Sequence, residues 1–308
     1  MNMDNDIFKL DSVKKYNDFY GIETFNPLIS VVDFSKCSNK NVKLPARFLY
    51  GLYAIFLKDV KCGDIHYGKQ MYDYQEGTLV FFAPGQLVSF EYKEPPKDED
   101  KPHQCYGLLF HRDLLSRLPL ARSIDSYSFF SYQSNEALHL SLDERRVIMD
   151  CIKNINEELH SEQDPHSRQL IVSNIELLLN YCDRFYDRQF SVRKKINDDI
   201  LVKLEYLLDD YFRSDKVKEH GLPTVSYFAD QLHLSPNYFG DLVKKNTSES
   251  PQKFIQSKLL EVAKEKVLDT SKSLVQVSYE LGFDYSQHFS RWFKKSLGCT
   301  PREYRKVN

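Results

Sequence analysis

The stretch GFDYSQHFSRWFKKSLGCTPREYR, residues 282–305, decides the fold of the C-terminal part of the chain, because much of it repeats an earlier segment. That segment, HLSPNYFGDLVKKNTSESPQKF, occupies residues 233–254, about fifty residues upstream. Aligned in this register, the copies share aromatic, lysine and proline positions: Phe239 with Phe289, Lys244 and Lys245 with Lys294 and Lys295, and Pro251 with Pro301. The repeat predicts two copies of one small helical motif.

Each copy reads as two short helices separated by a tight turn. Thr224 and Ser273 are placed to cap the first helix of each copy, because their hydroxyls can accept from the free amides of the first turn. Ala229 and Ser278 are small residues at matching places, where another helix can approach closely. Gly282 suits the left-handed position that ends a helix. Two short helices joined in this way form a helix-turn-helix, whose second helix normally lies in the major groove of DNA.

The second helix of each copy has an apolar face and a polar face. The positions expected to point inward are Phe239, Leu242, Val243, Phe289, Trp292 and Phe293. Glutamine and arginine can make paired hydrogen bonds to adenine and guanine in the major groove, whereas lysine neutralises phosphate. The expected base-reading residues are Asn237, Tyr238, Asp241, Tyr285, Ser286, Gln287, Ser290 and Arg291, and the expected phosphate contacts are Lys244, Lys245, Lys294 and Lys295. Because Asp241 repels phosphate, the second copy is expected to read bases more strongly than the first.

One long helix, residues 251–269, is expected to join the two copies. A stiff connection of this kind would let the two reading helices enter successive major grooves about 34 Å apart on one face of the duplex. Short helices with polar faces also occur in plain helical bundles, which are the alternative. The duplication favours DNA binding, because a bundle without a helical ligand gives no reason to repeat the motif.

Composition and charge agree with a DNA-binding segment at one end of the chain. The chain has 308 residues, which favours two domains, and 42% of them are apolar. Its formal net charge is −2, yet residues 242–308 contain 13 basic and 7 acidic residues, a net charge of +6. The six cysteines are scattered, and neither a signal peptide nor an apolar run long enough to span a membrane is evident. A cytoplasmic protein is expected.

The N-terminal half changes character along its length. Residues 45–112 read as short strands, including two β-rich runs around a turn at Pro84–Gly85, and predict an antiparallel barrel or sandwich. Residues 141–186 read as two amphipathic helices, the first opened by a capping box of Ser141 and Glu144. These helices could cover the open side of the barrel or pair with a second copy of the chain.

The C-terminal residues, about a hundred of them, resemble the AraC/XylS family of bacterial transcription regulators. The resemblance rests on ADQLHLSPNYFGDLVKK, AKEKVLD and YELGFDYSQHFSRWFKKSLGCTPREYR, in this order and at the family's spacing. The chain departs from the family at Lys258, where Arg is usual, at Ser278, where Ala is usual, and at Gly240–Asp241, where larger polar or basic residues are common. The resemblance implies a sequence-specific DNA binder, most often an activator that recruits RNA polymerase at a promoter.

The N-terminal half resembles the family more loosely, through YQEGTLVFFAPGQ at residues 74–86. This resemblance implies a cupin-like sensor barrel followed by dimerisation helices, and therefore a small-molecule effector and a homodimer. The residues expected to line the effector pocket are Tyr53, His66, Phe82 and Phe90. Aromatic residues of barrel strands can equally form the packed core of the barrel.

A cupin-type metalloenzyme with a regulatory DNA-binding tail is the alternative function. A catalytic metal needs three or four protein ligands, and cupin enzymes supply them with a His-x-His pair and a nearby Glu. Here His66 stands alone, and Gln86 follows the Pro84–Gly85 turn where another histidine is often found. No metal, cofactor or catalytic residue is therefore expected, and common catalytic motifs are absent from the sequence.

These patterns predict an α+β chain of two domains. Residues 1–140 are expected to form the sensor barrel, 141–186 the helical dimerisation hairpin, 187–198 a linker, and 199–308 an all-α DNA-binding domain with two helix-turn-helix motifs. The expected partners are double-stranded DNA, a small-molecule effector, RNA polymerase and a second copy of the chain, with no membrane.

Overall fold

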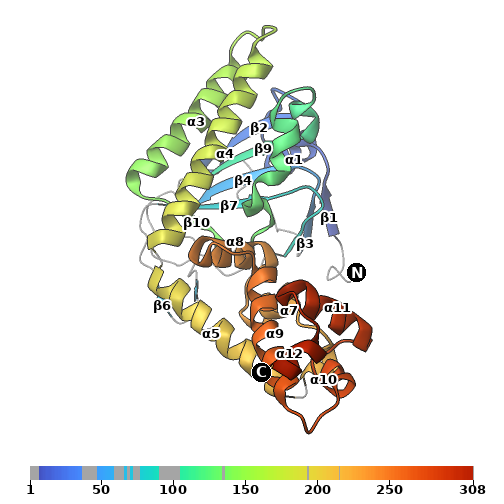
Figure 1. The fold of residues 1–308 in the computed structure, drawn as a ribbon. Coiled ribbons are helices and arrows are strands. Elements are labelled where there is room, and N and C mark those ends of the chain that lie inside the picture. The colour runs from blue at the N-terminus through green and yellow to red at the C-terminus, as the bar shows by residue number, and fades with distance from the viewer. Residues whose placement is uncertain are drawn as a thin grey trace, which may run out of the picture. The chain divides into compact units, whose positions relative to one another are not determined.

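The computed structural model of the chain describes residues 7–36, 47–58, 66–67, 70–71, 77–89, 105–133, 136–192, 194–214 and 216–307 (Figure 1). The chain divides into two compact units, Met1–Ser191 and Val192–Asn308. The first unit holds all the described strands and the second is helical, so the prediction of an α+β chain is confirmed. None of the helices in the described part of the chain combines the length and apolar content needed to cross a bilayer.

The strands of the first unit form three sheets. Their bounds are β1 Ile7–Leu10, β2 Ile29–Asp33, β3 Arg47–Tyr50, β4 Tyr53–Lys58, β5 His66–Tyr67, β6 Gln70–Met71, β7 Thr78–Phe82, β8 Leu87–Ser89, β9 Tyr106–Phe110 and β10 Leu138–His139. The sheet orders are β10-β7-β4-β9-β2, β1-β3-β8 and β5-β6. Within the described ranges these sheets do not close into a barrel, and β1 pairs with β3 in parallel. The strands within residues 45–112 pair antiparallel with one another, as expected, whereas β1 comes from N-terminal residues that the strand pattern did not include.

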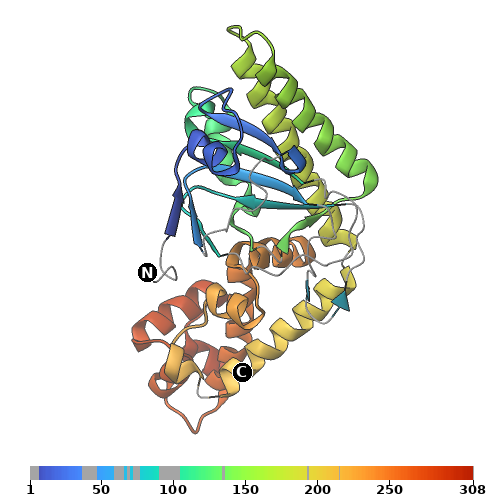
Figure 2. The ribbon, with the colours of Figure 1, turned by 180° about the vertical axis from the view of Figure 1, so that it is seen from behind.

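Both faces of the five-stranded sheet are buried. On one face, Ala54, Phe56 and Phe82 pack in an aromatic cluster with Tyr16 of α1 (Val13–Tyr20). On the other face, the ring of Phe81 lies 6.2 Å from that of Tyr186 in α4 (Ser167–Val192). Figures 1 and 2 show α1 on one side of this sheet and the helices of residues 142–160 and 167–192 on the other. Burial on both sides explains why β4 and β7 are apolar at nearly every position instead of alternating.

Two residues of the expected effector pocket, Tyr53 and Phe82, lie on opposite faces of this sheet. Ala54 of β4 pairs with Phe82 of β7, so the side chains of these two residues lie on the same face of the sheet. Tyr53 precedes Ala54 in β4, and because side chains alternate along a strand it points to the opposite face. Phe82 stacks on Tyr50 with ring centroids 5.1 Å apart, and Tyr53 stacks on Phe110 at 5.2 Å. Both residues belong to the packed core, with Tyr53 3% and Phe82 8% exposed. Phe90 and the side chain of His66 lie outside the described part of the chain.

The expected helical hairpin is present. Helix α3 (Leu142–His160) begins with a capping box in which Ser141 and Glu144 exchange hydrogen bonds, as predicted, and α4 follows it. Arg188 of α4 makes two hydrogen bonds to the Glu144 carboxylate, at 2.8 and 2.9 Å, and one to the His139 carbonyl at 2.6 Å. The hairpin covers the sheet, which is one of the two roles left open by the sequence.

The stretch expected to be a linker is largely helical. Helix α4 continues to Val192 and α5 (Lys194–Arg213) begins two residues later. The boundary between the two units, after Ser191, falls inside the expected 187–198 segment. Phe190 lies four residues after Tyr186 and is buried with it, their ring centroids 6.3 Å apart, so the apolar stripe of α4 continues into this stretch.

The remaining helices complete the list of elements. In the first unit these are α2 Leu120–Ser123 and the short 3₁₀ helices η1 Phe34–Lys36, η3 Arg112–Leu115, η4 Ile124–Ser126 and η5 Ser128–Ser131. In the second unit they are α6 Lys216–His220, α7 Val225–Gln231, α8 Pro236–Thr247, α9 Pro251–Leu268, α10 Leu274–Glu280, α11 Ser286–Leu297 and α12 Pro301–Val307. Helix α9 packs against α7 and α8 on one side of the sequence repeat and against α10 and α12 on the other.

Candidate nucleic-acid interface

The helix pairs α7–α8 and α10–α11 are built around the same hydrogen-bonded turn. In the first pair the amide of Leu234 donates to the carbonyl of Ala229 at 2.9 Å, and in the second the amide of Phe283 donates to Ser278 at 3.0 Å. Ala229 and Ser278 are fully buried, as expected for small residues where helices approach. Thr224 and Ser273 cap α7 and α10, which confirms both predicted caps.

The second turn is one residue longer than the first. Up to the turn, equivalent positions are 49 residues apart, since His233 with φ 57° corresponds to Gly282 with φ 85°. After the turn they are 50 residues apart, because Ser235 precedes α8 and Tyr285 precedes α11. Asp284 is the additional residue. It is exposed and lies just before Tyr285, the residue that precedes α11.

Helix α8 buries a broader face than the sequence predicted. Phe239, Leu242 and Val243 are fully buried, as expected, but Tyr238 is also 0% exposed. The expectation that Tyr238 reads bases is therefore wrong. Tyr238 lies four residues before Leu242 and one before Phe239, so it extends the apolar stripe by a second row. The adjacent aromatic pair was the signal that could have revealed this.

The exposed residues at the start of α8 are few. Asn237 is exposed and, among the described residues, its side chain makes no hydrogen bond. Asp241 is half-buried, one turn further along the helix. The hydroxyl of Ser235 accepts a hydrogen bond from the amide of Tyr238 at 3.2 Å, so a side chain already caps the first turn.

Helix α11 presents more polar groups. Phe289 and Phe293 are buried and Trp292 is half-buried, while Tyr285, Gln287 and Arg291 are exposed and Ser286 and Ser290 are half-buried. Within the described residues, the side chains of Gln287 and Arg291 make neither a hydrogen bond nor an ion pair. The Tyr285 ring packs near that of His288, with centroids 5.3 Å apart. Tyr285 provides no side-chain cap, but its carbonyl accepts from the amide of His288 at 2.9 Å, so within the described residues the first-turn amides without an acceptor are those of Ser286 and Gln287.

The four predicted phosphate-contacting lysines are all exposed. Lys244 and Lys245 lie in the last turn of α8, and Lys294 and Lys295 in the last turn of α11. Helix α11 contains Lys294, Lys295 and Arg291 and has no acidic residue, whereas α8 includes Asp241. The positive potential is therefore greater on α11 than on α8.

Ion pairs and hydrogen bonds fix the helices behind this surface. Lys258 of α9 lies 2.9 Å from the Asp209 carboxylate of α5, and Glu280 of α10 accepts from Lys266 and Lys272, each at 2.9 Å. The hydrogen bonds from these two lysines lower the pKa of Glu280. The Arg305 guanidinium of α12 donates to three carbonyls in and after the end of α9, those of Val267, Asp269 and Lys272.

Residues 228–307 match the family model of the helix-turn-helix domain. YobQ of Bacillus subtilis (strain 168), an uncharacterized HTH-type transcriptional regulator, is 33% identical over 32% of this chain and 46% of its own. The HTH-type transcriptional activator RhaS of Enterobacter sp. (strain 638) is 31% identical over 35% of this chain and 37% of its own. The C-terminal part of the chain is a helix-turn-helix domain of the AraC type.

Among solved structures, the C-terminal domain of the response regulator yesN from Fusobacterium nucleatum is similar to the AraC-type domain of this chain. The two share 24% identity and a TM-score of 0.31, over 35% of this chain and 98% of the other. The chain spans about half the length of the curated relatives that it matches first, from 46% of YobQ to 64% of the regulator YijO of Escherichia coli (strain K12).

The comparisons do not support the metalloenzyme alternative, because the relatives of the AraC-type domain are named as transcriptional regulators. In the described ranges, no group of three or more His, Cys, Asp or Glu residues could hold a metal ion. Besides Tyr238, sequence reasoning missed the extra turn residue Asp284 and the difference in capping between Ser235 and Tyr285. Asp284 could be found only by placing a gap in the alignment of the two copies, and the alignment by a constant offset has none.

Proposed function

We propose that the chain is a sequence-specific transcription regulator whose α8 and α11 are the reading helices of two helix-turn-helix units. The observation that carries the proposal is the surface of α11, where Gln287 and Arg291 are exposed without hydrogen-bond partners among the described residues. Both side chains can make paired hydrogen bonds to base edges in the major groove. Each good pair favours the correct base over a wrong one by about 1–3 kcal/mol. Around them, Lys294 and Lys295 would bind phosphate and so add affinity without adding sequence information.

The two units would differ in how they contribute. Helix α8 offers Asn237 and a half-buried Asp241 to the duplex, and Ser235 caps its first turn. Helix α11 offers two base-reading side chains, three cations and uncapped amides that can donate to a phosphate. We therefore assign most base recognition to α11 and mainly a positioning role to α8. Helix α9, about 27 Å long from its 18 residues, supports a fixed spacing between them.

The N-terminal unit would act as the sensor and pairing part of the regulator. The five-stranded and three-stranded sheets around the aromatic cluster support a cupin-like sensor, and α4 exposes Leu170 and Leu177 one heptad apart, at 49% and 46%. An exposed apolar stripe on a long helix supports pairing with a second copy of the chain. Effector control and activation through RNA polymerase belong to this proposal, as do the cytoplasmic location and the domain roles assigned to 1–140, 141–186 and 199–308.

The test is selection of bound duplexes from a random library by the full-length chain at about 0.15 M salt, followed by competition with random DNA. We expect recovery of a common sequence that binds at least about a thousandfold more tightly than random DNA, since specific regulators reach that ratio. A homodimer predicts that the recovered DNA carries two copies of the site. Failure of any duplex to outcompete random DNA would contradict the proposed function.

A further inference from the structure

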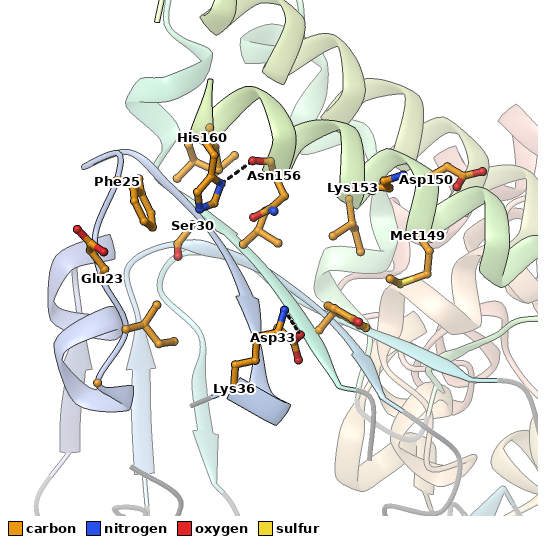
Figure 3. Close-up of a pocket in the computed structure, with 17 residues that line it drawn as sticks. Glu23, Phe25, Ser30, Asp33, Lys36, Met149, Asp150, Lys153, Asn156 and His160 are labelled. Atoms are coloured by element: carbon orange, nitrogen blue, oxygen red, sulfur yellow. Dashed lines mark hydrogen bonds and ion pairs between the residues drawn. The ribbon is translucent and has the colours of Figure 1, made fainter. Parts of the chain in front are cut away.

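The first unit contains a cavity of about 580 Å³ between α3 and the segment that leads from α1 into β2 (Figure 3). Its volume lies within the range of roughly 300–1,000 Å³ that is typical of small-molecule sites. Neither the sequence repeat nor the DNA-binding proposal assigns a role to it. It is also distinct from the core residues Tyr53 and Phe82, which the sequence had suggested as an effector pocket.

The cavity combines an apolar wall with an exposed aromatic ring. Ile29 of β2 and Ile152 of α3 are almost fully buried behind it, at 1% and 3% exposure. Phe25 also lines the cavity but is 55% exposed, and its ring centroid lies 4.3 Å from that of His160. Figure 3 shows these two rings side by side at one end of the cavity. An exposed phenyl ring in this position can pack against an apolar or cationic ligand group.

His160 presents a hydrogen-bond acceptor in its neutral form. Its Nδ1 lies 2.7 Å from the backbone carbonyl of Asn156, and because a carbonyl cannot donate, the proton of this bond must be on Nδ1. In the neutral ring, Nε2 is then unprotonated and can accept from a donor on a ligand. Among the described residues, no partner occupies Nε2.

The charges around the cavity favour a positively charged ligand. Both lysines of the lining are already in ion pairs, Lys36 with Asp33 at 3.2 Å and Lys153 with Glu157 at 3.6 Å. The lining carboxylates of Glu23 and Asp150 are exposed and have no cationic partner in the part of the chain that the structure describes. An anionic ligand would meet these carboxylates without a free cation to offset them. A cation would be attracted to either carboxylate, and Figure 3 shows Glu23 beside Phe25 at one end of the cavity and Asp150 at the other end.

We propose that this cavity binds an organic cation, a small amine or quaternary ammonium compound with an apolar or aromatic body. The apolar body would contact the wall formed by Ile29 and Ile152. The cationic group would lie near Phe25 and the Glu23 carboxylate, which Figure 3 shows at the same end of the cavity, and an ammonium N–H could donate to Nε2 of His160. Binding to the first unit does not depend on DNA, whereas a role for the ligand as the effector rests on the proposed function.

The experiment measures dissociation constants of three related probes for the full-length chain by ligand-observed NMR: 2-phenylethylammonium, 2-phenylethanol and phenylacetate. The cation is expected to bind about two- to five-fold more tightly than the alcohol, because an exposed carboxylate attracts an ammonium group only modestly. Phenylacetate is expected to bind most weakly. Glu23→Gln and Phe25→Leu should each weaken binding of the cation by about two- to five-fold, and Asp150→Asn should have a smaller effect because Asp150 lies at the other end of the cavity.

The matched control is Asp143→Asn, which removes the same charge from an exposed position of α3 outside the cavity and should leave all three constants unchanged. All four substituted residues are exposed, so the fold should be retained, and unchanged unfolding temperatures would verify this. The proposal is overturned if phenylacetate binds as tightly as the cation, if the cation shows no saturable binding, or if the Glu23→Gln, Asp150→Asn double variant binds it as the original chain does.

Discussion

Arg291→Ala is expected to lower affinity for the selected duplex by about ten-fold or more and to relax the base preference at one position of the site. The exposed guanidinium has no hydrogen-bond or ion-pair partner among the described residues, so its removal should not disturb the fold. The loss would come from a paired contact with guanine, for which about 1–3 kcal/mol is typical. Titration of the wild-type and variant chains on the selected site and on each single-base variant checks both effects.

Two control variants separate base reading from general charge. Lys294→Ala should weaken binding to all sequences alike and reduce the slope of log affinity against log salt by about 1, because one phosphate contact is lost. Arg213→Ala removes an exposed arginine from the end of α5 and should have little effect. If Arg291→Ala lowered affinity for specific and random DNA equally, Arg291 would be a phosphate contact and its proposed role would be wrong.

Gly282→Ala is expected to destabilise the C-terminal unit by about 2–5 kcal/mol. Gly282 has φ +85°, where an L side chain costs about 1–2 kcal/mol. A Cβ atom there would lie 2.8 Å from the backbone carbon and oxygen of Gly221, and relief of such a contact typically costs about 1–3 kcal/mol. Calorimetry of the full-length chain should show the midpoint of one transition lowered by roughly 10 °C or more.

The neighbouring turns supply matched controls for this effect. Gly298 at the end of α11 has φ +80° with no atom within 4 Å of an added Cβ, so Gly298→Ala should show only the backbone cost, about 1–2 kcal/mol. His233 occupies the equivalent position of the first turn at φ 57°, where glycine is favoured over other residues. His233→Gly should therefore raise the free energy of unfolding of the C-terminal unit by about 0.5–1 kcal/mol. Equal losses for Gly282→Ala and Gly298→Ala would show that the contact with Gly221 does not restrict the turn.

Much of the C-terminal unit could be predicted because its signals are local. Caps such as Thr224 and Ser273 act within one turn, and the inward stripes of α8 and α11 follow from helical spacing. Lys258 departs from the arginine usual in the related family, yet it still forms an ion pair with Asp209 at 2.9 Å, because a single charge suffices for this contact. The fold therefore tolerates the departure.

Other features depend on contacts between distant segments, which local patterns do not encode. The parallel pairing of β1 with β3 joins Ile7 to Arg47, and the two-sided burial of β4 and β7 hides which face each aromatic residue occupies. For the same reason Tyr53 and Phe82 looked alike in the sequence but lie on opposite faces of the sheet. The cavity beside Phe25 and His160 combines residues more than a hundred positions apart, so no motif could have indicated it.

The central claim is that α9 holds two reading helices at a spacing of one helical turn of DNA. Hydroxyl-radical footprinting combined with base-interference mapping on one copy of the selected site measures this directly. We expect two contacted stretches of major groove, centred about 10 base pairs apart on one face, with Arg291→Ala removing contacts from one stretch and Asn237→Ala from the other. A footprint confined to a single stretch of groove, or both variants acting on the same stretch, would contradict it.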